Sequence, residues 1–325
     1  MTNNPQFQRP SFQFSARKSP LAITVGILVL IGVLFTALSG FYADWLWFKS
    51  VNFTNTWSTI LTTKATLFVV SGLLTAFIVM FNVLLAYKRR PLYVPMTVEA
   101  DNLERYRSQV EPIRRPLFIG LSIALFYFAG SAGSQMWSTW LLFRNSTPFG
   151  VKDPQFNMDI SFFAFRLPFW QTLISWGIST AILAILASVA VHYLYGGIRL
   201  QVQEDRATVA ARVQLSVLLG LVVLLKAVAY WFDRYALALK ESRLITGLTY
   251  TDVNAVLPAK AILAGIAIVC ALLFFANIVR RSWVLPAAGT ALLVVSSVLI
   301  AGLYPGAIQQ FQVKPSESSK EAPFI

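Results

Sequence analysis

The chain has 325 residues, of which 56% are hydrophobic and only 13% are charged. Soluble globular proteins carry roughly 25% charged residues, so this composition excludes an ordinary soluble fold. The formal net charge is +13, but the basic residues stand mostly at the ends of apolar runs, which argues for membrane orientation and against nucleic acid as a partner. Because these runs are about as long as a bilayer of roughly 30 Å requires, the sequence predicts an all-α, polytopic bundle of about seven transmembrane helices.

The N-terminal residues 1–19 are polar and contain the cations Arg9, Arg17 and Lys18. We expect them to form a disordered cytoplasmic tail. The first apolar run, 21–38, is open to interpretation as a cleaved signal peptide, but its length favours a retained span. Further spans are expected at 65–87, 117–137, 169–195, 213–232, 261–279 and 284–304, so that residues 20–305 form one transmembrane domain.

The basic residues are divided unequally between the expected loops. With the N-terminus inside, cytoplasmic segments hold fifteen Lys or Arg residues and outer segments hold ten. The sequence therefore predicts a multi-pass protein of the cell membrane with a cytoplasmic N-terminus and an extracytoplasmic C-terminus. Two basic clusters flank the second cytoplasmic segment, and we expect them to contact anionic lipid: Lys88, Arg89, Arg90, Arg114 and Arg115.

Between these clusters lies the segment PMTVEADNLERYRSQVEPIRR, bracketed by Pro95 and Pro112. Leu103, Tyr106 and Val110 form one narrow apolar stripe on a helix. We expect a separate interfacial helix that connects two spans, with a regulatory element as the alternative.

Lys226 is the most informative single residue, because it lies inside the expected fifth span, seven residues before Asp233. A charged side chain inside a bilayer needs a partner, a water-filled pocket or an anionic ligand. None of the fourteen acidic residues lies inside an expected span, so hydroxyl groups are the available partners. The third span offers a polar stripe interleaved with Gly130 and Gly133, which permit close helix approach. The candidate polar cavity comprises Lys226, Tyr127, Ser131, Ser134 and Gln135, with structural hydrogen bonding as the alternative.

The outer loop after the fifth span contains a second candidate site. Gly247 marks a break in the chain, and Asp252 begins a short turn that either caps a helix or offers oxygen ligands to a hard cation together with Asn254. Asp159 is a further acid expected on this side. The candidate outer-loop site comprises Asp233, Glu241, Tyr250, Asp252 and Asn254.

No motif for nucleotide, zinc, redox or serine-hydrolase chemistry occurs in the chain: GxxxxGK[ST], HExxH, CxxC and GxSxG are all absent. Cys270 is alone inside an apolar run, and the single histidine, His192, is expected to be a hydrogen-bonding residue near the end of the fourth span. The sequence therefore predicts no catalytic residue, no cofactor and no metal, and argues against an enzyme without excluding one.

Four stretches together resemble one bacterial family. They are DRYxLxxxESRxxTGxxYTDVNAxLPA around Asp233 to Ala259, WLWFKSVNFTNTW, KDPQFNMDISFFAFRLPF and YPGAIQQFQVKPSESSKEAPFI. They resemble Uncharacterised Protein Family 0182, whose members have seven spans followed by a long extracytoplasmic domain. Asn52 and Asn157 depart from the family pattern, which usually has Gly at both positions. The resemblance implies that residues 306–325 begin a truncated extracytoplasmic region, and it transfers no catalytic residue.

These observations leave three functional hypotheses. The first is a membrane-embedded anchoring and assembly module for an extracytoplasmic cell-envelope domain. The second is a transporter or lipid-handling protein with a polar cavity at Lys226, and the third is a membrane enzyme that uses outer-loop carboxylates. The expected partners are the lipid bilayer and its anionic lipids, with envelope proteins or a second copy of the chain as further candidates.

Overall fold

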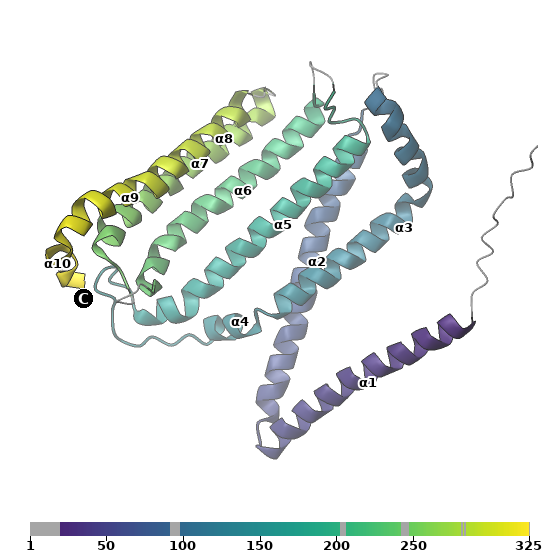
Figure 1. Ribbon diagram of the computed structural model, residues 1–325. Coiled ribbons are helices and arrows are strands. Elements are labelled where there is room, and N and C mark those ends of the chain that lie inside the picture. The colour runs from purple at the N-terminus through teal and green to yellow at the C-terminus, as the bar shows by residue number, and fades with distance from the viewer. Residues whose placement is uncertain are drawn as a thin grey trace, which may run out of the picture. The chain divides into compact units, whose positions relative to one another are not determined.

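The computed structural model describes residues 20–91, 98–201, 206–241, 247–280, 282 and 284–324. These residues are mostly helical and contain no strand, with two isolated β-bridges, Lys152–Asp159 and Ile198–Ala207. The all-α prediction is therefore confirmed. The longer helices are α1 (Pro20–Ser50), α2 (Thr54–Lys88), α3 (Val98–Ser134), α5 (Leu167–Leu194), α6 (Val209–Ala236), α7 (Leu257–Arg280) and α8 (Val284–Ser296) (Figure 1).

Shorter helical segments complete the fold. The α-helical ones are α4 (Trp137–Arg144), α9 (Tyr304–Ile308) and α10 (Glu317–Lys320). Four π-helical segments are η1 (Phe162–Arg166), η3 (Asp252–Val256), η4 (Ser297–Leu303) and η5 (Gln309–Val313), and three 3₁₀ turns are η2 (Leu237–Leu239), η6 (Lys314–Ser316) and η7 (Ala322–Phe324).

Within the described residues, seven helical stretches are long and apolar enough to cross a membrane. They correspond one to one with the expected spans, but they are longer: the second runs over Thr54–Lys88 and the fifth over Val209–Leu239. The difference arises because hydropathy marks only the part of a helix that lies in hydrocarbon, whereas aromatic and basic residues continue the helix through the headgroup region.

The chain divides into two compact units, the first ending at Leu61 and the second beginning at Thr62. In the first unit, Phe41 of α1 packs edge-on against Trp57 of α2 with ring centroids 5.0 Å apart. Asn52 takes a left-handed backbone conformation, φ 59°, in the turn between these helices. Asparagine tolerates this conformation better than most residues do, and glycine adopts it freely.

In the second unit, α5, α6, α7 and α8 pack against one another in chain order (Figure 1). Val79 and Val83 of α2 form a buried apolar cluster with Ala184 of α5 and Leu218 of α6. Helix α2 therefore packs against both α5 and α6, and this packing places its polar residues between them.

Glycines hold α2 and α3 close together. A Cβ atom on Gly72 would lie 2.6 Å from the Phe126 carbonyl oxygen, and one on Gly133 would lie 1.8 Å from the Ser71 hydroxyl oxygen. The close approach expected at Gly130 and Gly133 is present, but the helix that approaches is α2.

The expected interfacial helix is not a separate element, because residues 98–134 form one continuous helix, α3. Pro112 and Pro116 lie inside it and bend it without ending it (Figure 1). Proline in a sequence predicts a helix boundary, whereas a bent helix keeps the remaining backbone hydrogen bonds on both sides of the bend. Pro95 lies outside the described residues.

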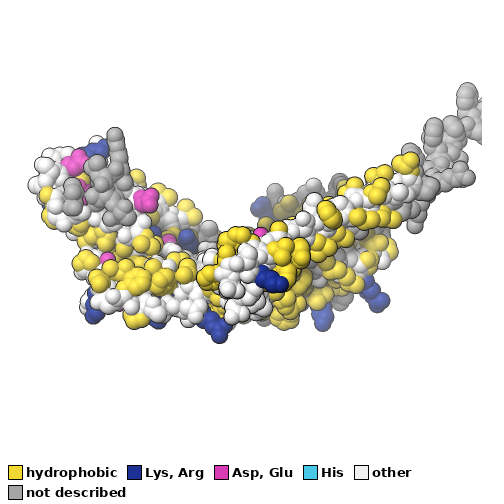
Figure 2. Space-filling model, turned by 90° about the horizontal axis from the view of Figure 1, so that it is seen from below, with side chains coloured by type: hydrophobic (Ala, Val, Ile, Leu, Met, Phe, Trp, Pro, Cys, Tyr) yellow, Lys and Arg dark blue, Asp and Glu magenta, His cyan; other side chains and the backbone are white. Residues whose placement is uncertain are grey.

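Large apolar side chains cover the outside of these helices. Phe77, Leu186 and Leu272 are 69%, 61% and 60% exposed. Figure 2 shows hydrophobic side chains across much of the visible face, with few acidic ones. An apolar exterior of this extent indicates a protein surrounded by lipid.

Candidate functional site

Lys226 is exposed on α6, and its ammonium nitrogen lies 4.9 Å from the centre of the Tyr230 ring on the same helix. The expected cavity between Lys226 and the third span is not formed, because α6 packs between α5 and α7 while α3 lies on the other side of α5 (Figure 1). Helical side chains lean toward the N-terminus, so the Tyr230 ring leans back over the lysine one turn before it.

The polar stripe of α3 has other neighbours. Tyr127 is 59% exposed and packs edge-on against Phe68 of α2 at 6.3 Å. The Ser134 hydroxyl donates to the Ser131 carbonyl oxygen at 2.8 Å, and Gln135 is exposed. These residues therefore serve the contact with α2 and the end of α3, and they form no site with Lys226.

Asp252, in the loop between α6 and α7, is 1% exposed and has several partners. Its carboxylate accepts hydrogen bonds from the Lys240 ammonium at 2.8 Å and from the Thr249 amide at 3.2 Å, while the Asp252 amide donates to the Thr249 hydroxyl oxygen at 3.3 Å. This reciprocal pattern is a capping box at the start of the sixth span, Asp252–Arg280. The geometry therefore supports capping, the first of the two roles considered for this residue.

The other outer-loop candidates do not gather around Asp252. Asp233 lies 3.5 Å from the Lys260 ammonium, Glu241 is exposed, and the Asn254 amide donates to the Tyr250 carbonyl oxygen at 3.0 Å. Among the residues that the structure describes, no group of three metal-ligating side chains is present.

Tyr250 connects the outer loop to the last segment of the chain. Its amide donates to the Glu321 carboxylate at 3.0 Å, the Lys320 ammonium lies 4.8 Å from its ring, and its ring packs edge-on against Phe324 at 6.2 Å. Residues 320–324 are thus bound to the start of the sixth span.

Asp159, in the loop between α4 and α5, organises backbone groups around its carboxylate. It accepts hydrogen bonds from the amides of Ser161, Phe149 and Gly150 at 2.9, 3.0 and 2.9 Å. The bonds from Ser161, followed by those from Phe149, hold the pKa of Asp159 well below its usual value. Its role in the fold is to close this loop.

The basic clusters meet an acid that sequence reasoning missed. Glu111 of α3 accepts hydrogen bonds from the hydroxyls of Tyr87 and Tyr195, both at 2.9 Å, and pairs with Arg114 and, at 3.7 Å, with Arg90. Burial and the bond to Glu111 raise the pKa of Tyr195 to about 12, so its hydroxyl remains a donor. We call these five residues the Glu111 cluster.

The remaining cations of the two basic clusters, Lys88, Arg89 and Arg115, are exposed. Contact of the five basic residues with anionic lipid stays a prediction. Two of them, Arg90 and Arg114, also join the ends of α2, α3 and α5 through Glu111.

A second group that sequence reasoning missed is a buried polar network between α2, α5 and α6. The Gln214 amide donates to the Asn82 carbonyl oxygen at 2.9 Å and to the Ser188 hydroxyl at 3.2 Å. The Gln214 side-chain oxygen lies 3.0 Å from His192 Nε2. His192, which is 1% exposed, is hydrogen-bonded as expected but buried and not interfacial. Asn82 and Gln214 stand out in the sequence as polar residues inside apolar runs, and that signal was available.

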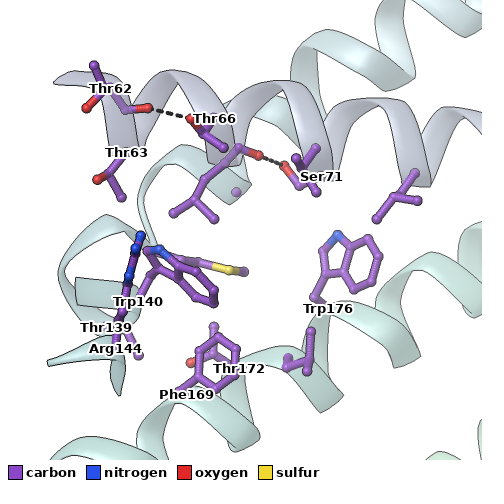
Figure 3. A pocket seen from close by; sticks show the side chains of 16 residues that line it. Thr62, Thr63, Thr66, Ser71, Thr139, Trp140, Arg144, Phe169, Thr172 and Trp176 are labelled. Atoms are coloured by element: carbon purple, nitrogen blue, oxygen red, sulfur yellow. Dashed lines mark hydrogen bonds between the residues drawn. The ribbon is translucent and has the colours of Figure 1, made fainter. Parts of the chain in front are cut away.

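The structure also contains a pocket of about 450 Å³ between α2, α4 and α5. Figure 3 shows Thr62 and Thr63 of α2 facing Thr139 and Arg144 of α4 across it. Trp140 and Phe169 form an aromatic wall with ring centroids 5.6 Å apart. No residue of this pocket was among the sequence-based candidates.

Comparison with known proteins identifies the family. Residues 21–325 match the model of the Uncharacterised protein family UPF0182. A UPF0182 protein from Streptomyces coelicolor is 48% identical over 96% of this chain and 32% of its own length. One from a Nocardioides species is 45% identical over 99% of this chain and 32% of its own length, and one from Frankia alni is 45% identical over 87% and 28%.

This chain therefore spans about a third of the length of the curated relatives that it matches. No solved structure matches it. The match over nearly the whole chain and the level of identity agree with the four sequence stretches that carried the resemblance. The chain belongs to the Uncharacterised protein family UPF0182.

Proposed function

We propose that this chain is the membrane-embedded anchoring and assembly module of a longer cell-envelope protein. The observation that carries the proposal is the buried network in which Gln214 binds Asn82, Ser188 and His192. Transport pathways use intramembrane polar groups to line water or substrate. Here these groups bind one another and join α2, α5 and α6, which favours a fixed support over a moving one.

Two further observations support the same function. The curated relatives are about three times as long as this chain. In a protein of that length, a membrane module would anchor a large additional region. The contacts of Tyr250 with Glu321 and Phe324 bind residues 320–324 to the outer loop, which limits the freedom of the segment at that end. The proposal keeps the N-terminus on the cytoplasmic side and the C-terminus outside.

The alternatives receive less support. Lys226 is exposed beside Tyr230, and the α3 residues expected to line a transport cavity with it do not surround it. Asp159, Asp233 and Asp252 are each engaged by separate structural partners, which disfavours a shared catalytic centre. Lipid binding is a second candidate function, and the pocket beside Arg144 favours it.

Co-purification tests the anchoring function. The chain, carrying an affinity tag, is co-expressed with the remaining part of the Streptomyces coelicolor relative as a separate polypeptide. We expect the remainder to be retained in detergent-solubilised membranes at about one copy per tagged chain. The exposed change Lys226→Met should preserve retention. A folded remainder that stays in the soluble fraction, beside a folded tagged chain, contradicts the proposal.

A further inference from the structure

The pocket between α2, α4 and α5 is polar at one end and apolar at the other. On α2, Thr62 and Thr63 line the first end, whereas Val70 and Leu74 line the second. With a rise of 1.5 Å per residue, Thr62 and Leu74 lie about 18 Å apart along the helix. Figure 3 shows Arg144 at the threonine end and Trp176 toward the opposite end.

Unused hydrogen-bond donors gather at the polar end. Arg144 is exposed, and within the described part of the chain no acidic side chain pairs with its guanidinium. None of the 16 residues that line the pocket is acidic. The hydroxyls of Thr63 and Thr139 have no protein partner among the described residues, whereas those of Thr66 and Thr172 donate to backbone carbonyl oxygens. The polar end therefore offers one cation and two hydroxyls to an anion.

The apolar end also contains one unused donor. The indole nitrogen of Trp176 is buried and has no hydrogen-bond partner. A buried indole N–H normally finds an acceptor. Val70, Leu74 and Leu173, which also line the pocket, carry no acceptor. A ligand with an oxygen atom beyond its charged group would satisfy the Trp176 donor.

We propose that this pocket binds a membrane amphiphile with a phosphate-bearing, anionic headgroup. The phosphate pairs with Arg144 and accepts hydrogen bonds from Thr63 and Thr139. An ester oxygen accepts from Trp176, and an acyl chain lies along Val70 and Leu74. This site is a function additional to anchoring. Its test measures retained lipid, whereas the anchoring test measures a retained polypeptide, so failure of one proposal leaves the other intact.

The size and openness of the pocket suit this ligand. A volume of about 450 Å³ lies within the roughly 300–1,000 Å³ range of small-molecule sites and accommodates a headgroup with the first part of its chains. Val70 and Leu74 remain 47% and 45% exposed, so the apolar end opens sideways. The rest of the acyl chains can therefore extend into the bilayer.

Native mass spectrometry of the detergent-solubilised chain tests the site with three probes: phosphatidylglycerol, phosphatidylcholine and inorganic phosphate. We expect one tightly retained phosphatidylglycerol per chain, much less phosphatidylcholine, and no retained inorganic phosphate. Arg144→Gln should reduce phosphatidylglycerol retention by about tenfold, because it removes a charge-assisted hydrogen bond. The matched change Arg166→Gln, at an exposed arginine that ends η1 and lies outside the pocket lining, should leave retention unchanged.

Val70→Trp tests the apolar end independently of charge. This substitution fills the space for the acyl chain and should lower phosphatidylglycerol retention while Arg144 remains in place. Equal loss of retention in Arg144→Gln and Arg166→Gln would overturn the site, because it would indicate non-specific attraction to positive charge. Binding of inorganic phosphate without selective retention of phosphatidylglycerol would show that the pocket binds free phosphate and would overturn the proposal of a lipid ligand.

Discussion

The two ends of the α2–α5 pair use arginine and hydroxyl groups in opposite ways. At one end, Arg90, Arg114, Tyr87 and Tyr195 all converge on the single carboxylate of Glu111. At the other end, Arg144 stands beside hydroxyl groups with no acid among the pocket residues. At the Glu111 end the polar groups are therefore satisfied by contacts within the chain, whereas at the Arg144 end the hydrogen-bond donors remain available to a ligand.

The largest expected effect comes from the glycine contact that aligns α2 with α3 between these ends. Gly72→Ala places a methyl group 2.6 Å from the Phe126 carbonyl oxygen, so the helices must separate. We expect a loss of about 3 kcal/mol in the free energy of unfolding, because overpacking against backbone has no easy relief. Thermal unfolding in detergent measures it. Gly120→Ala is the control, since its methyl group meets no atom within 4 Å, and unchanged stability of both variants would contradict the α2–α3 packing.

The next effect contrasts the two ends directly. Glu111→Gln removes the charge that faces Arg90 and Arg114, and should cost about 1–2 kcal/mol after allowance for its partial exposure. Arg144→Gln should change the free energy of unfolding by less than about 0.5 kcal/mol, because it breaks no protein contact. Chemical unfolding of both variants in the same detergent provides the comparison. Equal losses would show that the Arg144 end is also closed by structural contacts.

A smaller and local effect depends on pH. The pKa of Asp159 is lowered in the folded protein, so its stabilising contribution is present above the unfolded value of about 3.8 and is lost as the pH falls through the folded value. We expect the amides of Phe149 and Gly150 to stay protected from hydrogen exchange at pH 4 and to lose protection only in stronger acid. Asp159→Asn should lose protection already at neutral pH. Early loss in the unmodified chain would contradict this role.

The smallest expected effect concerns the turn between α4 and α5. Asn157 has φ 53°, a left-handed conformation that glycine adopts without steric cost. Asn157→Gly should therefore raise the free energy of unfolding slightly, on the order of 0.5 kcal/mol, and should not alter lipid retention. A destabilised variant would indicate that the Asn157 side chain has a role beyond tolerating this conformation.

The sequence predicted the fold well because apolar runs of bilayer length leave few alternatives to a helix. It did not indicate the left-handed backbone of Asn52 and Asn157, two residues that lie between helices. Helix partners were harder to predict. Gly130 and Gly133 signal close packing, but a single sequence does not state whether α2 or α6 approaches them.

The candidate sites depended on that missing information. Lys226 was assigned to a cavity because burying its charge is costly, yet the packing order leaves it exposed beside Tyr230. Asn82 and Gln214 carried a similar signal and do meet between α2 and α6. The pocket was not predicted because threonine and tryptophan at span ends are ordinary interfacial residues in a sequence. Only the packing of α2, α4 and α5 places them around one pocket.

The two prolines of α3 predict the depth at which this helix enters a bilayer. Pro112 and Pro116 have no amide hydrogen, so the carbonyl oxygens of Ser108 and Pro112 lose their helical donors. Hydrocarbon cannot replace a missing donor, whereas the hydrated headgroup region can. Counting from Pro116 to Ser134 gives about 28 Å of helix at 1.5 Å per residue, close to the thickness of the hydrocarbon layer. We therefore expect the bend to lie in the headgroup region at one face of the membrane, with the rest of α3 crossing the hydrocarbon layer.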